Sequence, residues 1–451
     1  MKTLISLFFL ILLMFSVSAQ SDSGDILIDN GTILTVTNGV LRGSDILIRD
    51  GKIHKIAKNI EPGNARVIDA GGLYVLPGII DAHSHIAIDA VNEASNPVTA
   101  EVWVGDALDP YDISIYRALA GGVTISHAMH GSANAIGGQC ETIKHRWGVT
   151  DPDDLRMDGA PRTIKFALGE NPIRVHGEGK DVVPNTRMGV EQVFRHSFSK
   201  AREYMIGWEK FRNGHSKTAP QYSLRLETLA DILKGDIIIH CHSYRADEIL
   251  MLMNVLKDYG VNKICFQHVN EGFKVAPELA AFGAHASVFS DWWAYKFEVY
   301  YSTAYNAAIL TRNGVVTSIN SDSGELIRHL YHEAAKAQKY GGLTDEQTLA
   351  LITLNPAIQL GIDDRVGSIE EGKDADIAIF KNHPLSIYAI NQYTIVDGEI
   401  RFNIHEDEED QRIDINPEET IPAFYEATEA HDHEAEGCMQ GVYEFLFEHK
   451  H

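Results

Sequence analysis

Hydrophobic and polar positions alternate with a period of two in three short segments between residues 25 and 74. These segments are DILIDNGTILTV, SDILIRDGKIHKIA and ARVIDAGGLYVL. The alternation is typical of half-buried strands, and the Asn-Gly and Asp-Gly pairs between alternating stretches predict hairpin turns. A similar pattern returns in residues 367–402. We therefore expect a small β-sandwich domain built from both chain ends, with residues 20–74 and 363–404 as its two parts.

The residues between these parts, 75–362, show a different pattern, in which short apolar runs are separated by helix-like segments. Eight runs are present: LPGIIDAHSH, GGVTISHA, CETIKH, RTIKFAL, GDIIIHCHS, NKICFQH, AHASVFS and GVVTSINSD. Amphipathic segments such as RADEILMLMNVLKDYG and GELIRHLYHEAAKAQKYG end in glycine, a common helix stop. Alternating strands and helices predict an α/β fold, a closed parallel (β/α)8 TIM-type barrel, with a doubly wound open sheet as the alternative.

The first 19 residues combine Lys2, an apolar run from Leu4 to Phe15, and the small residues Ser18 and Ala19. This pattern is that of a secretory signal peptide, and it is too short for a lasting membrane span. We expect this segment to be removed and the protein to be exported to the periplasm or the extracellular space. No later segment is a continuous apolar run of membrane length.

The formal net charge of −24 argues against nucleic acid and anionic membranes as partners. Much of the acidic excess lies in residues 405–451, a tail that also contains histidines and that we expect to be solvated. A chain of 451 residues with 44% hydrophobic residues has the composition of an ordinary globular protein of enzyme size. The small-molecule or short peptide substrate that we expect rests on the motifs and the resemblance described below. Barrels of this type commonly associate, so a homo-oligomer is compatible with the sequence. Four cysteines are too few and too widely spaced for a disulfide framework: Cys140, Cys241, Cys265 and Cys438.

Polar residues recur where the predicted barrel strands end, which is where barrel enzymes carry their chemistry. His83 and His85 end the first strand one residue apart, so a strand period of two places both on one side. Lys165 lies within the fourth strand, where an internal lysine is costly unless it is paired or chemically altered. The fifth, sixth and eighth strands end in His240, His268 and Asp322. Neutral imidazoles and a carboxylate suit zinc or a similar divalent ion at an open catalytic site.

Further polar residues lie in loops at the same predicted rim. The glycine-rich segment 126–139 would bring His130 and Asn134 towards substrate, although a structural loop is an equal alternative. Arg187, in the long insertion of residues 169–235, is a candidate clamp for a substrate carboxylate. One further histidine, His242, shares the orientation of His240 and is assigned to the pocket or to hydrogen bonds with ligands.

These motifs together resemble the amidohydrolase superfamily, specifically its imidazolonepropionase-related branch with prolidase-like dipeptidases. The resemblance covers residues 25–402 and rests on LPGIIDAHSH, on GGVT, on the His, His, Asp order of strands five, six and eight, and on LITLNPAIQLGI followed by GSIEEGKDADIAIF. It implies one ion on His83, His85 and Asp322, and a second ion on His240 and His268. It also implies a carboxylated Lys165 as the bridge between them. Glu170, shortly after Lys165 in the segment KFALGENP, is an alternative carboxylate that could replace the lysine, and without a bridge the site holds one ion.

The resemblance further implies hydrolysis of an amide, peptide or cyclic amide bond by metal-activated water, with Asp322 accepting the proton of that water. Two alternatives stay open at the level of sequence. Deaminases of this superfamily usually carry a glutamate three residues after the strand-five histidine, where this chain has Ser243. A non-catalytic binding protein would be expected to have lost ligands, and all the expected positions are occupied.

Overall fold

The computed structural model describes residues 24–180, 182–293 and 295–406. The predicted signal peptide and nearly all of the acidic tail, including Cys438, lie outside these residues. Cys140, Cys241 and Cys265 are buried free thiols. Among the described residues, no helix is both long enough and apolar enough to cross a membrane.

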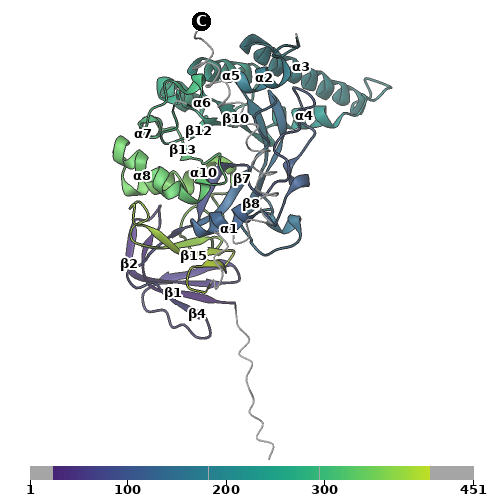
Figure 1. Cartoon of the computed structure of the whole chain (residues 1–451). Helices are drawn as coiled ribbons and strands as arrows, with labels where there is room; N and C mark the ends of the chain where they lie inside the picture. The colour runs from purple at the N-terminus through teal and green to yellow at the C-terminus, as the bar shows by residue number, and fades with distance from the viewer. Residues whose placement is uncertain (1–23, 181, 294, 407–451) are drawn as a thin grey trace, which may run out of the picture.

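The middle of the chain forms one sheet of eight strands whose order in space follows the sequence (Figure 1). The strands are β6 (Ile79–Ser84), β7 (Val123–Ala128), β8 (Ile136–Lys144), β9 (Arg162–Ala167), β10 (Ile237–Ser243), β11 (Ile264–His268), β12 (His285–Val288) and β13 (Thr317–Ile319). Most of their residues are buried, as expected for a sheet that is covered on both faces. The expected α/β class and the eight predicted strands are confirmed.

The third strand departs from the expected parallel barrel, because β8 runs antiparallel to both β7 and β9. The physical reason is the connection: residues 129–135 join β7 to β8 directly, and a parallel crossover needs a dozen or more residues. The predicted strand was also too short, since β8 begins at Ile136 within the segment that we expected to be a loop. The all-parallel arrangement is therefore wrong at this position.

The two edge strands of the sheet, β6 and β13, lie close to each other, so the sheet is nearly closed. The backbone nitrogen of Asp322, just beyond β13, donates to the carbonyl oxygen of His83 in β6 at 3.1 Å. This bond joins the first and last strands at the edge where the candidate site lies.

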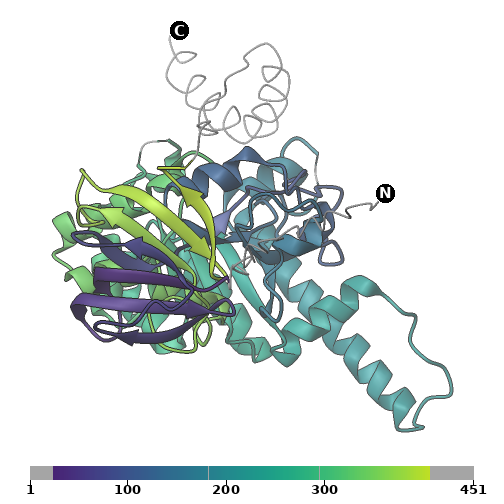
Figure 2. The same ribbon diagram turned by 90° about the horizontal axis from the view of Figure 1, so that it is seen from below.

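Helices cover the outside of this sheet (Figure 1). They are α1 (Ile113–Ala120), α2 (Glu170–His176), α3 (Arg187–Arg212), α4 (Leu224–Lys234), α5 (Ala246–Tyr259), α6 (Ala276–Phe282), α7 (Asn306–Arg312), α8 (Leu330–Gly341), α9 (Asp345–Ala350) and α10 (Leu354–Leu360). Short 3-10 helices are η1 (Val104–Ala107), η2 (Pro152–Leu155), η3 (Gly272–Lys274), η4 (Phe297–Val299) and η5 (Leu326–His329). The predicted stop of α5 is confirmed, because Gly260 caps it with φ of 77°. The long insertion supplies α2, α3 and α4, and α3 projects away from the barrel (Figure 2).

Both chain ends contribute to a second sheet, as the sequence predicts. Its order is β16-β15-β14-β5-β1-β2-β3, with β4 paired to β1. The strands are β1 (Ile26–Leu34), β2 (Val40–Arg49), β3 (Lys52–Ala57), β4 (Arg66–Asp69), β5 (Tyr74–Pro77), β14 (Ile377–Lys381), β15 (Ile390–Val396) and β16 (Glu399–Asn403). The antiparallel pair β5 and β14 joins the two ends of the chain. A division into two facing layers, and the domain boundaries, stay predictions.

Two of the Asp-Gly and Asn-Gly pairs form the hairpin turns that the sequence predicts, and one does not. Asp50-Gly51 and Asp397-Gly398 connect β2 to β3 and β15 to β16, all four with positive φ, as hairpin turns require. Asn30-Gly31, in contrast, lies inside β1 at a shift of register with β2. The pair forms an irregularity in the strand because a positive φ at Asn30 suits a bulge as well as a turn.

A buried ion-pair network fastens the second sheet to the barrel. Lys144, the last residue of β8, is fully buried and its Nζ lies 2.8 Å from Asp374 Oδ2 and 3.2 Å from Asp376 Oδ1. It also pairs with Asp397 in the turn after β15. Since a buried lysine is stable only when its charge is matched, this network fixes the position of one sheet against the other.

Candidate metal centre

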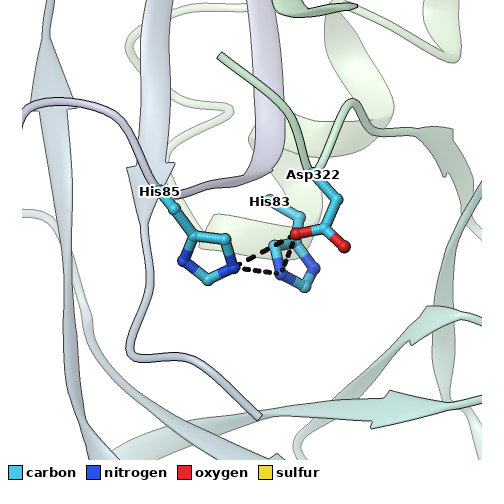
Figure 3. A group of neighbouring side chains, drawn as sticks. All are labelled: His83, His85 and Asp322. Carbon is cyan, nitrogen blue, oxygen red and sulfur yellow. Dashed lines mark hydrogen bonds and ion pairs between the residues drawn. The ribbon is translucent and has the colours of Figure 1, made fainter. Parts of the chain in front are cut away.

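Three side chains converge at the end of β6, beside the segment that follows β13 (Figure 3). His85 Nε2 lies 3.1 Å from Asp322 Oδ1, and His83 Nε2 lies 3.4 Å from the same oxygen. The two Nε2 atoms are 3.3 Å apart. Both histidines are buried, whereas Asp322 keeps 24% of its side chain exposed, so the group opens towards solvent at the carboxylate.

The other ring nitrogens decide which tautomer each histidine adopts. His85 Nδ1 lies 2.9 Å from the carbonyl oxygen of Met129, and His83 Nδ1 lies 3.2 Å from Oε1 of Gln267. Because both oxygens are acceptors, both Nδ1 atoms donate, and each Nε2 atom is left facing the Asp322 carboxylate. Two imidazole nitrogens and a carboxylate oxygen therefore meet within one group that fits a divalent cation.

Asp322 is held in an unusual backbone conformation, with φ of 47° in the left-handed region. Such strain in a residue other than glycine is typical of functional sites. Burial raises the pKa of its carboxyl group, but the hydrogen bond from His85 and the positive charges around it lower that pKa to about 2. The carboxylate is therefore ionised at neutral pH, as a metal ligand or a general base requires.

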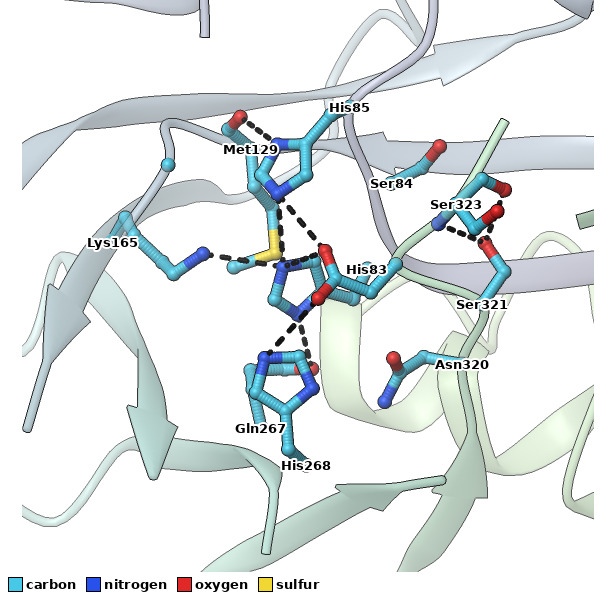
Figure 4. A network of polar contacts seen from close by, with 12 residues as sticks. His83, Ser84, His85, Met129, Lys165, Gln267, His268, Asn320, Ser321 and Ser323 are labelled. Carbon is cyan, nitrogen blue, oxygen red and sulfur yellow. Dashed lines mark hydrogen bonds and ion pairs between the residues drawn. The ribbon is translucent and has the colours of Figure 1, made fainter. Parts of the chain in front are cut away.

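Lys165 reaches the same group from β9 (Figure 4). Its Nζ lies 3.2 Å from His83 Nε2 and donates to the carbonyl oxygen of His130 at 3.1 Å. The side chain is fully buried. The structure thus brings Lys165 to the group, whereas Glu170 lies at the start of α2 and pairs with Arg174 and Lys296 instead.

His268 ends β11 with φ of 67°, also in the left-handed region, and its Nε2 lies 3.7 Å from Asp322 Oδ2. Its ring stacks on Phe289 with centroids 4.5 Å apart. Burial lowers the pKa of His268 to about 3, so its imidazole is neutral at pH 7 and suited to a metal. Neither ring nitrogen has a hydrogen-bond partner among the described residues.

The two histidines of β10 have different surroundings. The His242 ring lies 4.8 Å from the His268 ring, and neither of its nitrogens has a hydrogen-bond partner among the described residues. His240 lies deeper in the barrel, where Nε2 of Gln267 donates to its Nδ1 at 3.0 Å and its ring lies 4.4 Å from that of His127. The His240 Nε2 atom also has no hydrogen-bond partner among the described residues, and His240 pairs in register with Lys165. The His242 ring lies beside His268, and the predicted role of His240 as a ligand stays a prediction.

The remaining candidates use their polar atoms within the protein. His130 donates from Nδ1 to the Gly131 carbonyl at 3.0 Å and accepts at Nε2 from the Glu93 backbone nitrogen at 2.9 Å. The side-chain nitrogen of Asn134 donates to three oxygens of the loop between β6 and α1. Both contacts favour the structural reading of this segment, and a role towards substrate stays a prediction.

Arg187 begins α3 and pairs with Glu248 and Glu298, the latter at 3.3 Å. Both glutamates are buried, and burial raises the pKa of Glu248 to about 7. This arginine therefore holds the insertion against α5 and the β12 loop, so its charge is already matched. A clamp for a substrate carboxylate stays a prediction that these contacts do not favour.

Two buried residues that support the group, Asp81 and Gln267, were not predicted from the sequence. Asp81 accepts from the backbone nitrogens of His83 and Ser321 and from the Ser321 hydroxyl, which ties β6 to the segment after β13. Burial raises the pKa of Asp81 to about 7. Gln267 contacts both His83 and His240. In a regular strand Gln267 and His268 would face opposite sides, so a pattern that places His268 in the site places Gln267 outside it. The positive φ of His268 breaks this alternation, and the sequence does not show it.

The chain is similar to several known proteins. A model described as the amidohydrolase family matches residues 74–404. The chain is 31% identical over 401 residues to amidohydrolase tasK of Hapsidospora irregularis, covering 80% of this chain and 40% of that protein. It is 24% identical over 351 residues to imidazolonepropionase of Thermoplasma volcanium, covering 75% and 84%. A solved amidohydrolase from Thermotoga maritima has 34% identity and a TM-score of 0.78, covering 84% of this chain and all of that one.

Proposed function

Since this chain belongs to the amidohydrolase family, we propose that it is a metal-dependent hydrolase that cleaves a C–N bond of a small molecule or short peptide. The bond would be an amide, peptide or cyclic amide. The observation that carries the proposal is the convergence of His83 Nε2, His85 Nε2 and Asp322 Oδ1, all within hydrogen-bonding range of one another. The chain spans less than half of its tasK relative, so the activity is argued from this site.

The residues present fit zinc or a similar divalent ion. His83, His85 and Asp322 would hold a first ion. A second ion would lie on His268 with a histidine of β10, either His240 as predicted or its neighbour His242. Neutral imidazoles and one carboxylate are the ligands that zinc prefers.

Lys165 would complete a two-ion site as a carbamate. Its neutral amine adds to carbon dioxide, the new N–C bond forms, and one proton leaves to solvent. The carbamate replaces a buried positive charge, which lies 3.2 Å from a histidine nitrogen, with a negative charge. The negative charge would attract divalent ions at this place, whereas a buried ammonium group would repel them.

When bound, the ions polarise the scissile carbonyl and lower the pKa of a water molecule towards neutrality. Asp322 would accept a proton from the attacking water and donate it to the leaving amine. Its low pKa keeps it ionised before the attack, and its partly exposed side chain faces the opening of the site. His83 and His85 are held by Gln267 and Met129 and serve to fix the geometry.

Deamination of a heterocycle has less support from the contacts. Ser243 stands where the superfamily's deaminases usually have glutamate. Its hydroxyl is buried and donates to the Gln267 carbonyl at 3.0 Å, so it offers no acid that would protonate a ring. We also infer export, a β-sandwich arrangement of the second sheet and self-association, which rest on the sequence patterns above.

The activity is tested with metal-replete protein on dipeptides, N-acyl amino acids and cyclic imides. Release of an amine that is lost in Asp322→Asn and kept in Asp236→Asn supports the proposal. Asp236 is exposed and precedes β10 at the opposite end of the barrel, so it is a matched control. Release of ammonia from heterocyclic amines instead would favour a deaminase, and no turnover of any of these substrates would contradict the amidase proposal.

A further inference from the structure

The outer part of α3 projects away from the barrel together with the loop that follows it (Figure 2). Tyr204 is the last buried residue of this helix, and none of residues 205–225 is buried. We call residues 200–224 the arm. Because most helical stability in proteins comes from packing of an apolar face, the outer part of the arm gains little from its own chain as far as the structure describes it.

The arm is basic, whereas the chain as a whole is acidic. Residues 200–224 contain five lysines and arginines and two acidic residues, in a chain with a formal net charge of −24. Lys200 pairs with Glu203 at 2.9 Å. Three further basic residues of the arm are exposed and form no ion pair with any described residue: Lys210, Arg212 and Lys217. Their positive charges are therefore available to a partner.

The same segment exposes large apolar side chains. Ile206 is 44% exposed, Phe211 37% and Tyr222 65%, and Leu224 at the start of α4 is 52% exposed. The rings of Trp208 and Phe211 lie edge to face with centroids 6.0 Å apart. Unpaired positive charges next to exposed apolar side chains suit a partner that is both acidic and apolar.

The chain itself contains such a segment in residues 407–451, which follow the last described residue, Glu406. The segment has 14 acidic and two basic residues, and its acidic residues flank the apolar runs IPAFY and VYEFLF. Fully extended, its 45 residues reach about 150 Å. A folded chain of the described length has a radius of gyration of about 21 Å. The length of the segment therefore allows contact with the arm.

We propose that residues 407–451 dock on the arm of their own chain, with carboxylates paired to its three free cations and the apolar runs packed against Ile206 and Phe211. This inference goes beyond the proposed function and does not depend on it. The charge pattern alone predicts a solvated segment, and the arm adds partners for its charges. Attachment to the same chain favours the contact, because it gives an effective concentration on the order of 1 mM.

Zero-length cross-linking tests this contact in the full chain. A carbodiimide condenses a carboxylate with a lysine amine into an amide bond and takes up the water that is lost. We expect links from Lys210 and Lys217 to residues 407–451 to be roughly tenfold more frequent than links from Lys55 and Lys58. These two control lysines are exposed at and just after β3 in the second sheet. Equal frequencies for the arm and the control lysines would overturn the proposal.

A mixture of unlabelled and nitrogen-15-labelled protein separates the two sources of the acidic segment. We expect every link to join peptides of the same label, since the segment docks on its own chain. Links between labelled and unlabelled peptides would show that a second copy supplies the segment, and they would overturn the proposal.

Amide hydrogen exchange measures the contact without chemical modification. We expect residues 205–217 to exchange about tenfold more slowly in the full chain than in a chain that ends at Glu406. The reason is that a Kd of about 0.1 mM at an effective concentration of about 1 mM gives roughly 90% occupancy. Exchange in β9 and β10 should be equal in both chains, which verifies that the barrel is folded. Equal exchange of the arm would contradict docking.

A full-length variant keeps the test decisive if the shortened chain fails to fold. Lys210→Gln, Arg212→Gln and Lys217→Gln together should speed exchange in both the arm and the acidic segment several-fold, because docking protects both. Faster exchange in the arm alone would reflect only the helix end and would overturn the proposal. The matched control replaces three exposed lysines of the second sheet and should change neither region: Lys55→Gln, Lys58→Gln and Lys381→Gln.

Discussion

The Nε2 atoms of His83 and His85 face each other at 3.3 Å, while both Nδ1 atoms donate to oxygens elsewhere in the barrel. Both Nε2 atoms also face the Asp322 carboxylate, at 3.4 Å from His83 and 3.1 Å from His85. A cation between these atoms would be attracted by the carboxylate and ligated by both rings. The polypeptide therefore builds a cation site by fixing the outer nitrogens of its ligands.

Replacing His85 by asparagine should remove the first ion and lower kcat/KM on the order of 10³-fold, since several kcal/mol of transition-state stabilisation depend on it. Asparagine is a smaller polar side chain, and it lacks the Nε2 atom that would bind the ion. The measurement is steady-state turnover with added zinc. His54→Asn is the control, because His54 is exposed on β3 and should keep full activity.

Asp322→Asn should lower kcat on the order of 10²- to 10⁴-fold, the range typical of lost general acid–base catalysis. The amide is nearly the same size as the carboxylate but does not accept the proton of water. Steady-state kinetics at saturating zinc separates this loss from weaker ion binding. A variant with unchanged kcat would show that another group accepts the proton.

Lys144→Met should destabilise the folded protein by about 3–5 kcal/mol, because it leaves Asp376 buried without its positive partner and removes one of the three positive partners of Asp374. Urea unfolding measures the change. Lys234→Met is the matched control: Lys234 pairs with Asp231 at 2.9 Å on the surface, and such pairs contribute about 0–1 kcal/mol. Equal effects of the two substitutions would contradict a clamping role for Lys144.

Asp374, a member of this network, should lose its stabilising contribution in acid. Burial raises the pKa of Asp374, but Lys144, Lys52 and Arg365 lower it to about 2 from the usual 3.8. A lowered carboxyl pKa stabilises the fold above the unfolded value, and this contribution of about 2 kcal/mol disappears as pH falls from about 4 through 2. Urea unfolding between about pH 4 and pH 2 measures this change. The free energy of unfolding should depend more steeply on pH in the unmodified protein than in Asp374→Asn.

Strand periodicity and strand ends were sufficient to predict His83, His85, Lys165 and Asp322 at one place, because regular alternation determines which side chains face inward. Alternation failed at His268. Its positive φ turns the chain, so Gln267 and His268 both face the site, and neighbouring residues of a regular strand would face opposite sides.

One further difference from the predicted structure and one open choice have equally local causes. The orientation of β8 depends on the length of the link in residues 129–135, and its apolar residues would suit either direction. The choice between His240 and His242 depends on depth in the barrel, since both face inward with a period of two. The position of a residue along the barrel axis depends on how neighbouring strands pair. The hydrophobic pattern of one strand does not contain that information.

The most direct test of the account is zinc per chain, measured by elemental analysis of gel-filtered protein after incubation with zinc and bicarbonate. We predict close to two ions in the unmodified protein, fewer in Lys165→Ala and in His83→Asn, and an unchanged number in His54→Asn. One ion in both the unmodified protein and Lys165→Ala would contradict the carbamate bridge. No ion in the unmodified protein would contradict the metal centre itself.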